Sequence, residues 1–155
     1  MTGTETAEQI SSGYGNSIIL RRWIGCWIDM AVLLLFFFAP DGILGNALYQ
    51  KTLIIWAGLA IAYFPVLEGR FGWSLGKLVA GTRIVNASGE SPGFLAALLR
   101  TLTRVIEVNP LLVGGLPAGI IVLVSKKHQR LGDMLADTFV LKKEDLPRVR
   151  NGVAA

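Results

Sequence analysis

Asp29 is an acidic residue inside the apolar run RRWIGCWIDMAVLLLFFFA, which spans residues 21–39. A charged side chain at the centre of a membrane helix costs about 2.5–3.5 kcal/mol on insertion scales, so it needs either a compensating contact or a function. A buried carboxyl group can form an internal ion pair, line a path for protons or cations, or stay protonated. These three interpretations make Asp29 the first candidate for chemistry in this chain.

Arg22 precedes Asp29 by seven residues, which is two helical turns, so both side chains lie on one stripe of a helix. They are about 10 Å apart along the helix axis, too far for a direct ion pair. Gly25 and Cys26 lie between them on that stripe, and small residues let another segment approach closely. We therefore expect the partner of Asp29 to come from elsewhere in the chain.

Arg100 and Arg104 are the candidate counter-ions of Asp29. They stand four residues apart, on one face of the segment FLAALLRTLTRVIEV, residues 94–108. Two interpretations of this segment stay open. It is either an amphipathic helix in the membrane interface or a membrane helix whose arginines face protein.

No arrangement of residues supports an enzyme or a cofactor site. In GWSLGK, residues 72–77, Phe71 takes the place of the first glycine of a phosphate-binding loop, and Leu78 stands where Ser or Thr would bind magnesium. We expect Lys77 to contact lipid phosphate instead. The single His128 has no Cys, His or carboxylate cluster near it at ligand spacing, so no metal site is predicted.

The composition indicates an integral membrane protein. The 155 residues are 52% hydrophobic and only 17% charged, whereas soluble domains carry about 25% charged residues. The net charge is +4, but Lys and Arg flank the apolar runs and do not line a groove with aromatic residues. This distribution excludes nucleic acid as the expected partner.

Apolar runs and turn residues predict the elements that hold the candidate residues. In order, they are a flexible polar tail (1–17), a membrane helix (18–39) ended by PDG, a second membrane helix (47–67), and two apolar segments (94–108 and 111–124) separated by Asn109–Pro110. TRIVNASGE and TFVLKK are strand-like and would pair in a ribbon at the membrane surface. The predicted fold is an all-α integral membrane protein with three to four membrane-embedded helices and a short cytoplasmic β-ribbon.

The distribution of Lys and Arg predicts the orientation in the cell membrane. Basic residues precede the first helix, follow the second and recur after residue 125, whereas the connection 40–50 has none. Basic segments favour the cytoplasmic side, so both termini are expected there. Four crossings satisfy this orientation, and so do three elements in which 94–124 forms a re-entrant hairpin.

Three polar motifs, taken in order, resemble those of the RDD family of membrane proteins, which is named for one Arg and two Asp. The family's Arg at the start of the first membrane helix and its first Asp correspond to Arg22 and Asp29 in RWIGCWID. Its Ser-x-Gly-Lys element resembles SLGKLVAGTRIV, residues 74–85, and its closing element resembles KKHQRLGDMLADTFVL, residues 126–141. The resemblance covers residues 18–142.

The closing element places the family's second Asp at Asp133. Arg130 stands three residues before Asp133 and is its candidate counter-ion. Asp137 occupies a place where the family pattern has a small Gly, which leaves open whether Asp133 or Asp137 forms the ion pair. The segment 143–155 lies beyond the resemblance and is expected to be a C-terminal tail.

The resemblance implies a transport or ion-exchange component for an unidentified ligand. Asp29 would then exchange a proton or cation, and a homo-oligomer or a partner would supply the helices that enclose the path. The alternative is a non-transporting membrane adaptor or assembly factor, in which the Arg/Asp set is structural. Its basic cytoplasmic face would recruit proteins or anionic lipid. Neither hypothesis involves a cofactor or an enzymatic reaction.

Overall fold

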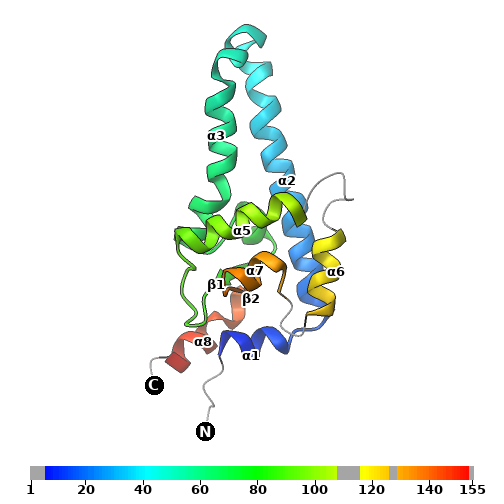
Figure 1. Cartoon of the computed structure of the whole chain (residues 1–155), viewed down its shortest axis with the longest axis vertical. Coiled ribbons are helices and arrows are strands. Elements are labelled where there is room, and N and C mark those ends of the chain that lie inside the picture. Colours follow the sequence, from blue (N-terminus) through cyan, green and yellow to red (C-terminus); the bar gives the residue numbers. More distant parts are fainter. Residues whose placement is uncertain (1–5, 108–115, 126–128, 154–155) are drawn as a thin grey trace.

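Two long helices form a hairpin that stands on a base of shorter helices and a two-stranded ribbon (Figure 1). The structure is a computed structural model, and it describes residues 6–107, 116–125 and 129–153. Helix α2 spans Asn16–Leu44 and helix α3 spans Asn46–Phe71. Gly45 joins them at a φ of 74°, a backbone conformation that favours glycine, so the chain reverses within one residue.

Both long helices extend past their predicted ends. Helix α2 continues through Pro40, so the prediction that PDG ends it is wrong. Proline removes one backbone hydrogen bond, a loss that membrane helices tolerate. Helix α3 likewise contains Pro65 and does not end at residue 67, so Glu68 lies inside a helix and not in a loop.

Two helices are long and apolar enough to cross a membrane among the residues that the structure describes, Ser17–Leu44 and Asn46–Phe71. The described parts of helices α5 (Phe94–Glu107) and α6 (Leu116–Val124) contain 14 and 9 residues, fewer than the roughly 20 that a crossing requires. The predicted break at Asn109–Pro110 and the single His128 lie outside the described residues.

The remaining elements are short and form the base of the hairpin. They are α1 (Ala7–Ser12), α4 (Leu75–Val79), β1 (Thr82–Val85), α7 (Leu131–Leu135), β2 (Phe139–Lys142), the 3-10 turn η2 (Lys143–Asp145) and α8 (Leu146–Val153). Figure 1 shows α5 across the base of the hairpin, with α7 and the ribbon beneath it. Helices α1 and α8 lie at the far end, near both chain termini.

The ribbon is formed by the two strand-like segments of the sequence. Strands β1 and β2 pair antiparallel, with Thr82 opposite Lys142 and Val85 opposite Phe139. The ribbon shares a small apolar core with α1 and α8, which consists of Ala7, Ile10, Val85, Phe139, Leu141, Leu146 and Val149. This core is separate from the apolar surface of the long hairpin.

Residues 6–17 of the flexible tail expected over 1–17 are ordered into helix α1 and the start of α2, which corrects the prediction for the part of it that the structure describes. The Thr6 hydroxyl accepts a hydrogen bond from the Gln9 N–H, and the Gln9 side chain accepts one from the Thr6 N–H, so the first turn of α1 is capped on both sides. Ala7 and Ile10, one turn apart, are buried in the apolar core. The sequence did not indicate this short helix, because most of its residues are polar.

The C-terminal end is also helical where the structure describes it, and this corrects the tail expected over 143–155. Leu146 and Val149 lie one turn apart in α8 and are buried in the same core. The Tyr14 hydroxyl donates a hydrogen bond to Asp145 Oδ2 at 2.6 Å, which ties the two ends of the chain together. Burial raises the pKa of Tyr14, and the hydrogen bond to Asp145 adds to this shift.

Candidate functional site

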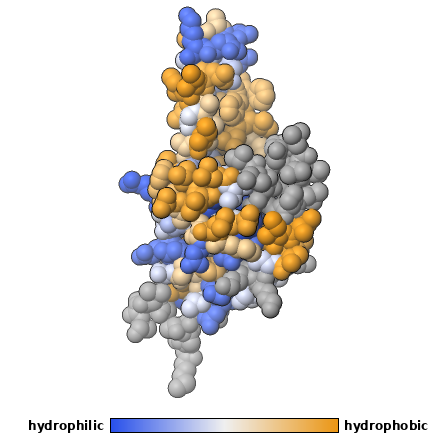
Figure 2. Space-filling view, viewed as in Figure 1, coloured by the Kyte–Doolittle hydropathy of each residue, from blue (hydrophilic) through white to orange (hydrophobic). Residues whose placement is uncertain are grey.

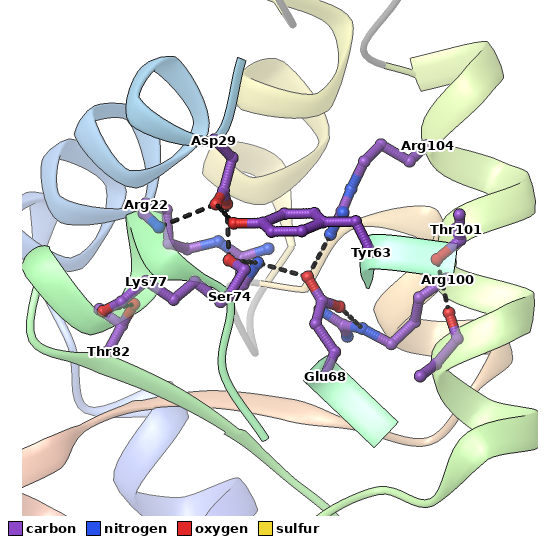
Figure 3. A network of polar contacts seen from close by, with 12 residues as sticks. Arg22, Asp29, Tyr63, Glu68, Ser74, Lys77, Thr82, Arg100, Thr101 and Arg104 are labelled. Atoms are coloured by element: carbon purple, nitrogen blue, oxygen red, sulfur yellow. Dashed lines mark hydrogen bonds and ion pairs between the residues drawn. The ribbon is translucent and has the colours of Figure 1, made fainter. Parts of the chain in front are cut away.

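Asp29 is buried between the two long helices and the start of α4, with 3% of its surface exposed. Its Oδ1 accepts hydrogen bonds from the Tyr63 hydroxyl at 2.9 Å and from the Gly76 N–H at 2.8 Å, and its Oδ2 accepts one from the Ser74 hydroxyl at 2.6 Å. The Leu75 N–H donates to the Tyr63 hydroxyl at 3.0 Å, which directs the hydroxyl proton toward Asp29. Figure 3 shows Tyr63 and Ser74 converging on this carboxylate, which neutral donors satisfy.

The close approach of α4 to α2 depends on two glycines. A methyl group on Gly76 would collide with the carbonyl oxygen of Gly25 and would lie 2.8 Å from Cγ of Asp29. A methyl group on Gly25 would lie 3.1 Å from the carbonyl oxygen of Gly76. The small residues between Arg22 and Asp29 thus admit a neighbouring segment, and that segment is α4.

The prediction that Arg100 or Arg104 neutralises Asp29 is wrong. Both side chains extend from α5 to the carboxylate of Glu68 near the end of α3, and Figure 3 shows both directed there. Helix α5 contacts α3, so its arginines reach the acid of that helix. The spacing of the arginines indicated a shared face but could not indicate which acid that face meets.

Glu68 is a buried acidic centre that the sequence analysis missed. Its side chain is fully buried. Oε1 accepts contacts from Lys77 Nζ at 2.6 Å and Arg104 Nη2 at 2.7 Å, and Oε2 accepts one from Arg100 Nε at 3.4 Å. The Arg104 guanidinium also lies over the Phe64 ring, 3.6 Å from its centroid. Glu68 therefore joins α3 to both α4 and α5.

Lys77 points into the protein, not to the lipid phosphate that the sequence analysis assigned to it. Its side chain is 12% exposed, and its Nζ contacts Glu68 at 2.6 Å and the Ser74 hydroxyl at 3.4 Å. Burial lowers the pKa of Lys77 to about 8, although Glu68 opposes the shift. The carboxylate of Glu68 takes the place of an external phosphate.

Asp133, in α7, is the acid around which three arginines gather. Its Oδ2 accepts contacts from Arg22 Nη2 at 2.5 Å and from the Arg130 N–H at 3.1 Å, and its Oδ1 pairs with Arg100 Nη1 and, at 3.7 Å, with Arg130 Nη2. Burial alone would raise the pKa of Asp133, but the attraction of Arg100, Arg22 and Arg130 outweighs burial and holds this pKa well below its usual range. Asp133 is therefore ionised at neutral pH.

Asp137 takes no part in this cluster. It is exposed, and its φ is 46°, in the left-handed region that favours glycine but that Asp also tolerates. A glycine, which the resemblance implied for this place, would adopt this conformation without strain. The pairing question left open by the sequence is answered in favour of Asp133.

Arg100 connects the two fully buried acids. Its Nε contacts Glu68 at 3.4 Å, and its Nη1 pairs with Asp133 and donates to the Thr138 hydroxyl at 2.5 Å. The Gln129 side-chain amide donates to the Thr138 carbonyl at 2.9 Å. One guanidinium thus links α3, α5, α7 and the segment that leads into β2.

The sequence around Glu68 contains a feature that indicates a buried acid. An acid in PVLEG is as unusual inside a membrane helix as Asp29 is, but the predicted helix end at residue 67 placed Glu68 in a loop. Tyr63 and Ser74 gave no comparable signal, because a hydroxyl in an apolar or glycine-rich segment is common. Their roles became apparent only from the packing of α3 and α4 around Asp29.

Two membrane-length helices that pack a buried layer of acids and cations against a base of short helices define a helical membrane protein. A model of the RDD family matches residues 18–137, which is more than half of the chain. The chain belongs to the RDD family. The matched range includes Arg22, Asp29 and Asp133. No curated protein and no solved structure matches the chain.

Proposed function

We propose that this RDD-family protein is a multi-pass protein of the cell membrane that acts, without catalysing a reaction, as an adaptor or assembly factor for other membrane proteins. The observation that supports this role is that each buried acid is fully engaged: Asp29 accepts three hydrogen bonds, and Glu68 and Asp133 each contact three cationic side chains. Acids held in this way stabilise one packed arrangement, whereas an exchange site has to release its partner in every cycle.

The proposed topology places both termini in the cytoplasm. Two crossings, α2 and α3, return the chain to the side on which it began. Basic residues stand at the base of the hairpin, for example Arg21, Arg70 and Arg83, and the connection between the two helices has none. This asymmetry favours a cytoplasmic base, where anionic lipid headgroups would be attracted.

Replacement of Asp29 by Asn separates a structural from a transporting role, with Asp41→Asn as the matched control. Asp41 is exposed near the hairpin tip, so its replacement should leave the protein unchanged. In the structural role, Asp29→Asn lowers the yield of folded protein and its unfolding temperature in detergent. Wild-type proteoliposomes then show no proton-coupled cation flux above that of empty liposomes.

The adaptor role also predicts a membrane-protein partner on the hairpin. Leu35 and Ile54 are 70% and 86% exposed on α2 and α3, so a photo-crosslinking amino acid at either position would report what covers the hairpin in cells. We expect a defined adduct with a different membrane protein. Adducts only with lipid and with a second copy of the chain would contradict an adaptor role.

Transport or ion exchange is the second candidate, and one observation favours it. Asp29 lies within a membrane-length helix. Among the residues that the structure describes, its hydrogen-bond donors are two hydroxyls and one amide, and none of them is a cation. The hydroxyls of Tyr63 and Ser74 can rotate and present oxygen to a cation. Proton-coupled flux that is present in the wild type, retained in Asp41→Asn and lost in a folded Asp29→Asn variant would establish this candidate and overturn the adaptor role.

A further inference from the structure

Helix α5 is an amphipathic helix whose charged face points inward. Arg100 is 1% exposed, whereas Phe94, Leu95 and Leu102 are 60%, 71% and 59% exposed. A helix on a water-exposed surface has the opposite arrangement. The arginines of this segment therefore face protein, as one of its two interpretations requires, and a surface rich in leucine remains uncovered.

Three other short helices beside the hairpin also expose apolar residues. Helices α4, α5, α6 and α7, here called the collar, all carry exposed large apolar residues. These are Leu75, Leu78 and Val79 on α4; Phe94, Leu95, Leu99 and Leu102 on α5; Ile120, Leu123 and Val124 on α6; and Leu131, Met134 and Leu135 on α7. Figure 2 shows hydrophobic residues on the visible face from below the hairpin tip down to the level of α5 and α6, with hydrophilic residues at the tip and further below.

The length of the hairpin determines where a bilayer fits. Helix α4 contacts α2 at Gly25 and Asp29. If the hydrocarbon layer ended above this contact, only the segment 30–44 would remain on α2, and it rises about 22 Å at about 1.5 Å per residue. The hydrocarbon core of a bilayer is about 30 Å thick. The part of the hairpin that extends beyond the collar is therefore too short to cross the hydrocarbon core by itself.

The charged residues on the two helices mark a span that does match. From Asp41 to Arg21 helix α2 rises about 30 Å, and from Lys51 to Arg70 helix α3 rises about 28 Å. Trp23, 45% exposed, lies just inside the Arg21 end, where tryptophan is enriched at membrane interfaces. This span contains the contacts of α2 and α3 with α4 and α5.

We infer that the collar is embedded in the membrane leaflet nearer the chain termini, with its exposed apolar side chains in contact with lipid acyl chains. The occupant of this surface is lipid because the surface continues the exposed apolar sides of α2 and α3 and lies within the same depth of about 30 Å of a bilayer. The layer of acids and cations is then enclosed between hairpin and collar inside that leaflet. The protein therefore has a larger cross-section in the leaflet that contains the collar than in the other leaflet, which the two long helices cross.

Depth-dependent fluorescence quenching tests this inference on the full-length protein. Cys26 is the only cysteine, so in a Cys26→Ser background single cysteines at Val79, Leu95 and Leu135 place an environment-sensitive label on three collar helices. Leu35→Cys, on the exposed apolar side of α2 that lipid covers when the purified protein is in vesicles, and Glu144→Cys, exposed in η2, are the controls. The labelled proteins are reconstituted in phosphatidylcholine vesicles that contain lipids brominated along the acyl chain.

Collar labels are expected to be quenched to within about two-fold of the label at Leu35, with the label at Glu144 unquenched. Collar labels that behave like the label at Glu144 would overturn the inference. The inference would also be overturned if brominated lipid failed to quench the labels and the same cysteines, without label, formed disulfide-linked dimers. The surface would then be covered by a second copy of the chain. Three helices carry labels, so misfolding of one variant leaves two independent measurements.

Discussion

Gly76→Ala is expected to separate α4 from the long helices. The added methyl group would collide with the backbone carbonyl oxygen of Gly25 and would lie 2.8 Å from Cγ of Asp29. Neither group can move away cheaply, because one is backbone and the other is held by Tyr63 and Ser74. The segment that carries Gly76 therefore has to shift, which lengthens the 2.8 Å hydrogen bond from its N–H to Asp29.

The expected cost combines two effects. Overpacking of a close contact costs about 1–3 kcal/mol, and loss of a hydrogen bond to a buried charged group costs about 1.5–3 kcal/mol. We therefore expect Gly76→Ala to lower the free energy of unfolding by about 3 kcal/mol or more. For a chain of this length, that loss corresponds to a fall of about 6–12 °C in unfolding temperature.

Gly58→Ala is the matched control, because Gly58 lies inside α3 and a methyl group there would meet nothing within 4 Å. Alanine favours helix over glycine by up to about 1 kcal/mol, so this variant should be as stable as the wild type or more stable. Thermal unfolding of both variants in the same detergent, followed by tryptophan fluorescence, makes the comparison. Equal unfolding temperatures for Gly76→Ala and Gly58→Ala would refute the packing of α4 against α2.

Three further predictions concern the buried charges. Glu68→Gln leaves three cations around a neutral group and should cost about 3–5 kcal/mol, whereas the exposed Glu144→Gln should change the unfolding temperature by less than about 1 °C in the same assay. Asp133→Asn should destabilise the protein at pH 7, and the stability difference between variant and wild type should shrink as the pH falls below about 4. The folded-state pKa of Asp133 is lowered, so the stability that the ionised carboxylate contributes is complete above the unfolded-state pKa and is lost as Asp133 becomes protonated. Burial lowers the pKa of Lys77 to about 8, so the folded protein releases this proton before the unfolded chain does. The free-energy cost of burying the charged Lys77 is therefore complete below about pH 8 and decreases as the pH rises toward the unfolded-state pKa. In denaturant titrations, the stability of the wild type relative to Lys77→Met should rise between about pH 8 and pH 10. A stability difference that stays constant over that range would contradict a buried, charged Lys77.

The elements that the sequence predicted well are those that a one-dimensional pattern specifies. Long apolar runs located both membrane-length helices, because hydropathy follows directly from burial. The strand-like segments TRIVNASGE and TFVLKK located both strands. The predicted ends of α2 and α3 were wrong, because both helices continue past an internal proline, Pro40 in α2 and Pro65 in α3. The short helices α1 and α8 were missed, because two buried residues each leave almost no periodic signal.

The candidate site divides in the same way. The types of residue that matter, acids and arginines inside apolar sequence, were visible because such residues are costly in lipid. The pairing of Arg100 and Arg104 with Glu68, and not with Asp29, depends on which helix α5 contacts, and spacing within one segment carries no information on that. Asp29 is satisfied by hydroxyl and amide donors, which are too common in sequences to be recognised as partners.

The arrangement of charges explains how so small a protein orients four short helices in lipid. Each collar helix has apolar residues to place against acyl chains, but α5 can turn them outward only if its opposite face finds acids, and Glu68 and Asp133 supply these. In water a misoriented arginine would be solvated at little cost, whereas within a leaflet it would remain without a partner. Glu68 and Asp133 therefore fix the rotation of α5 about its axis. The position of α4 is fixed by the hydrogen bond to Asp29 and by the ion pair of Lys77 with Glu68. On this reasoning Glu68 has the same structural importance as the two aspartates, and its loss should turn α5 rather than merely weaken one contact.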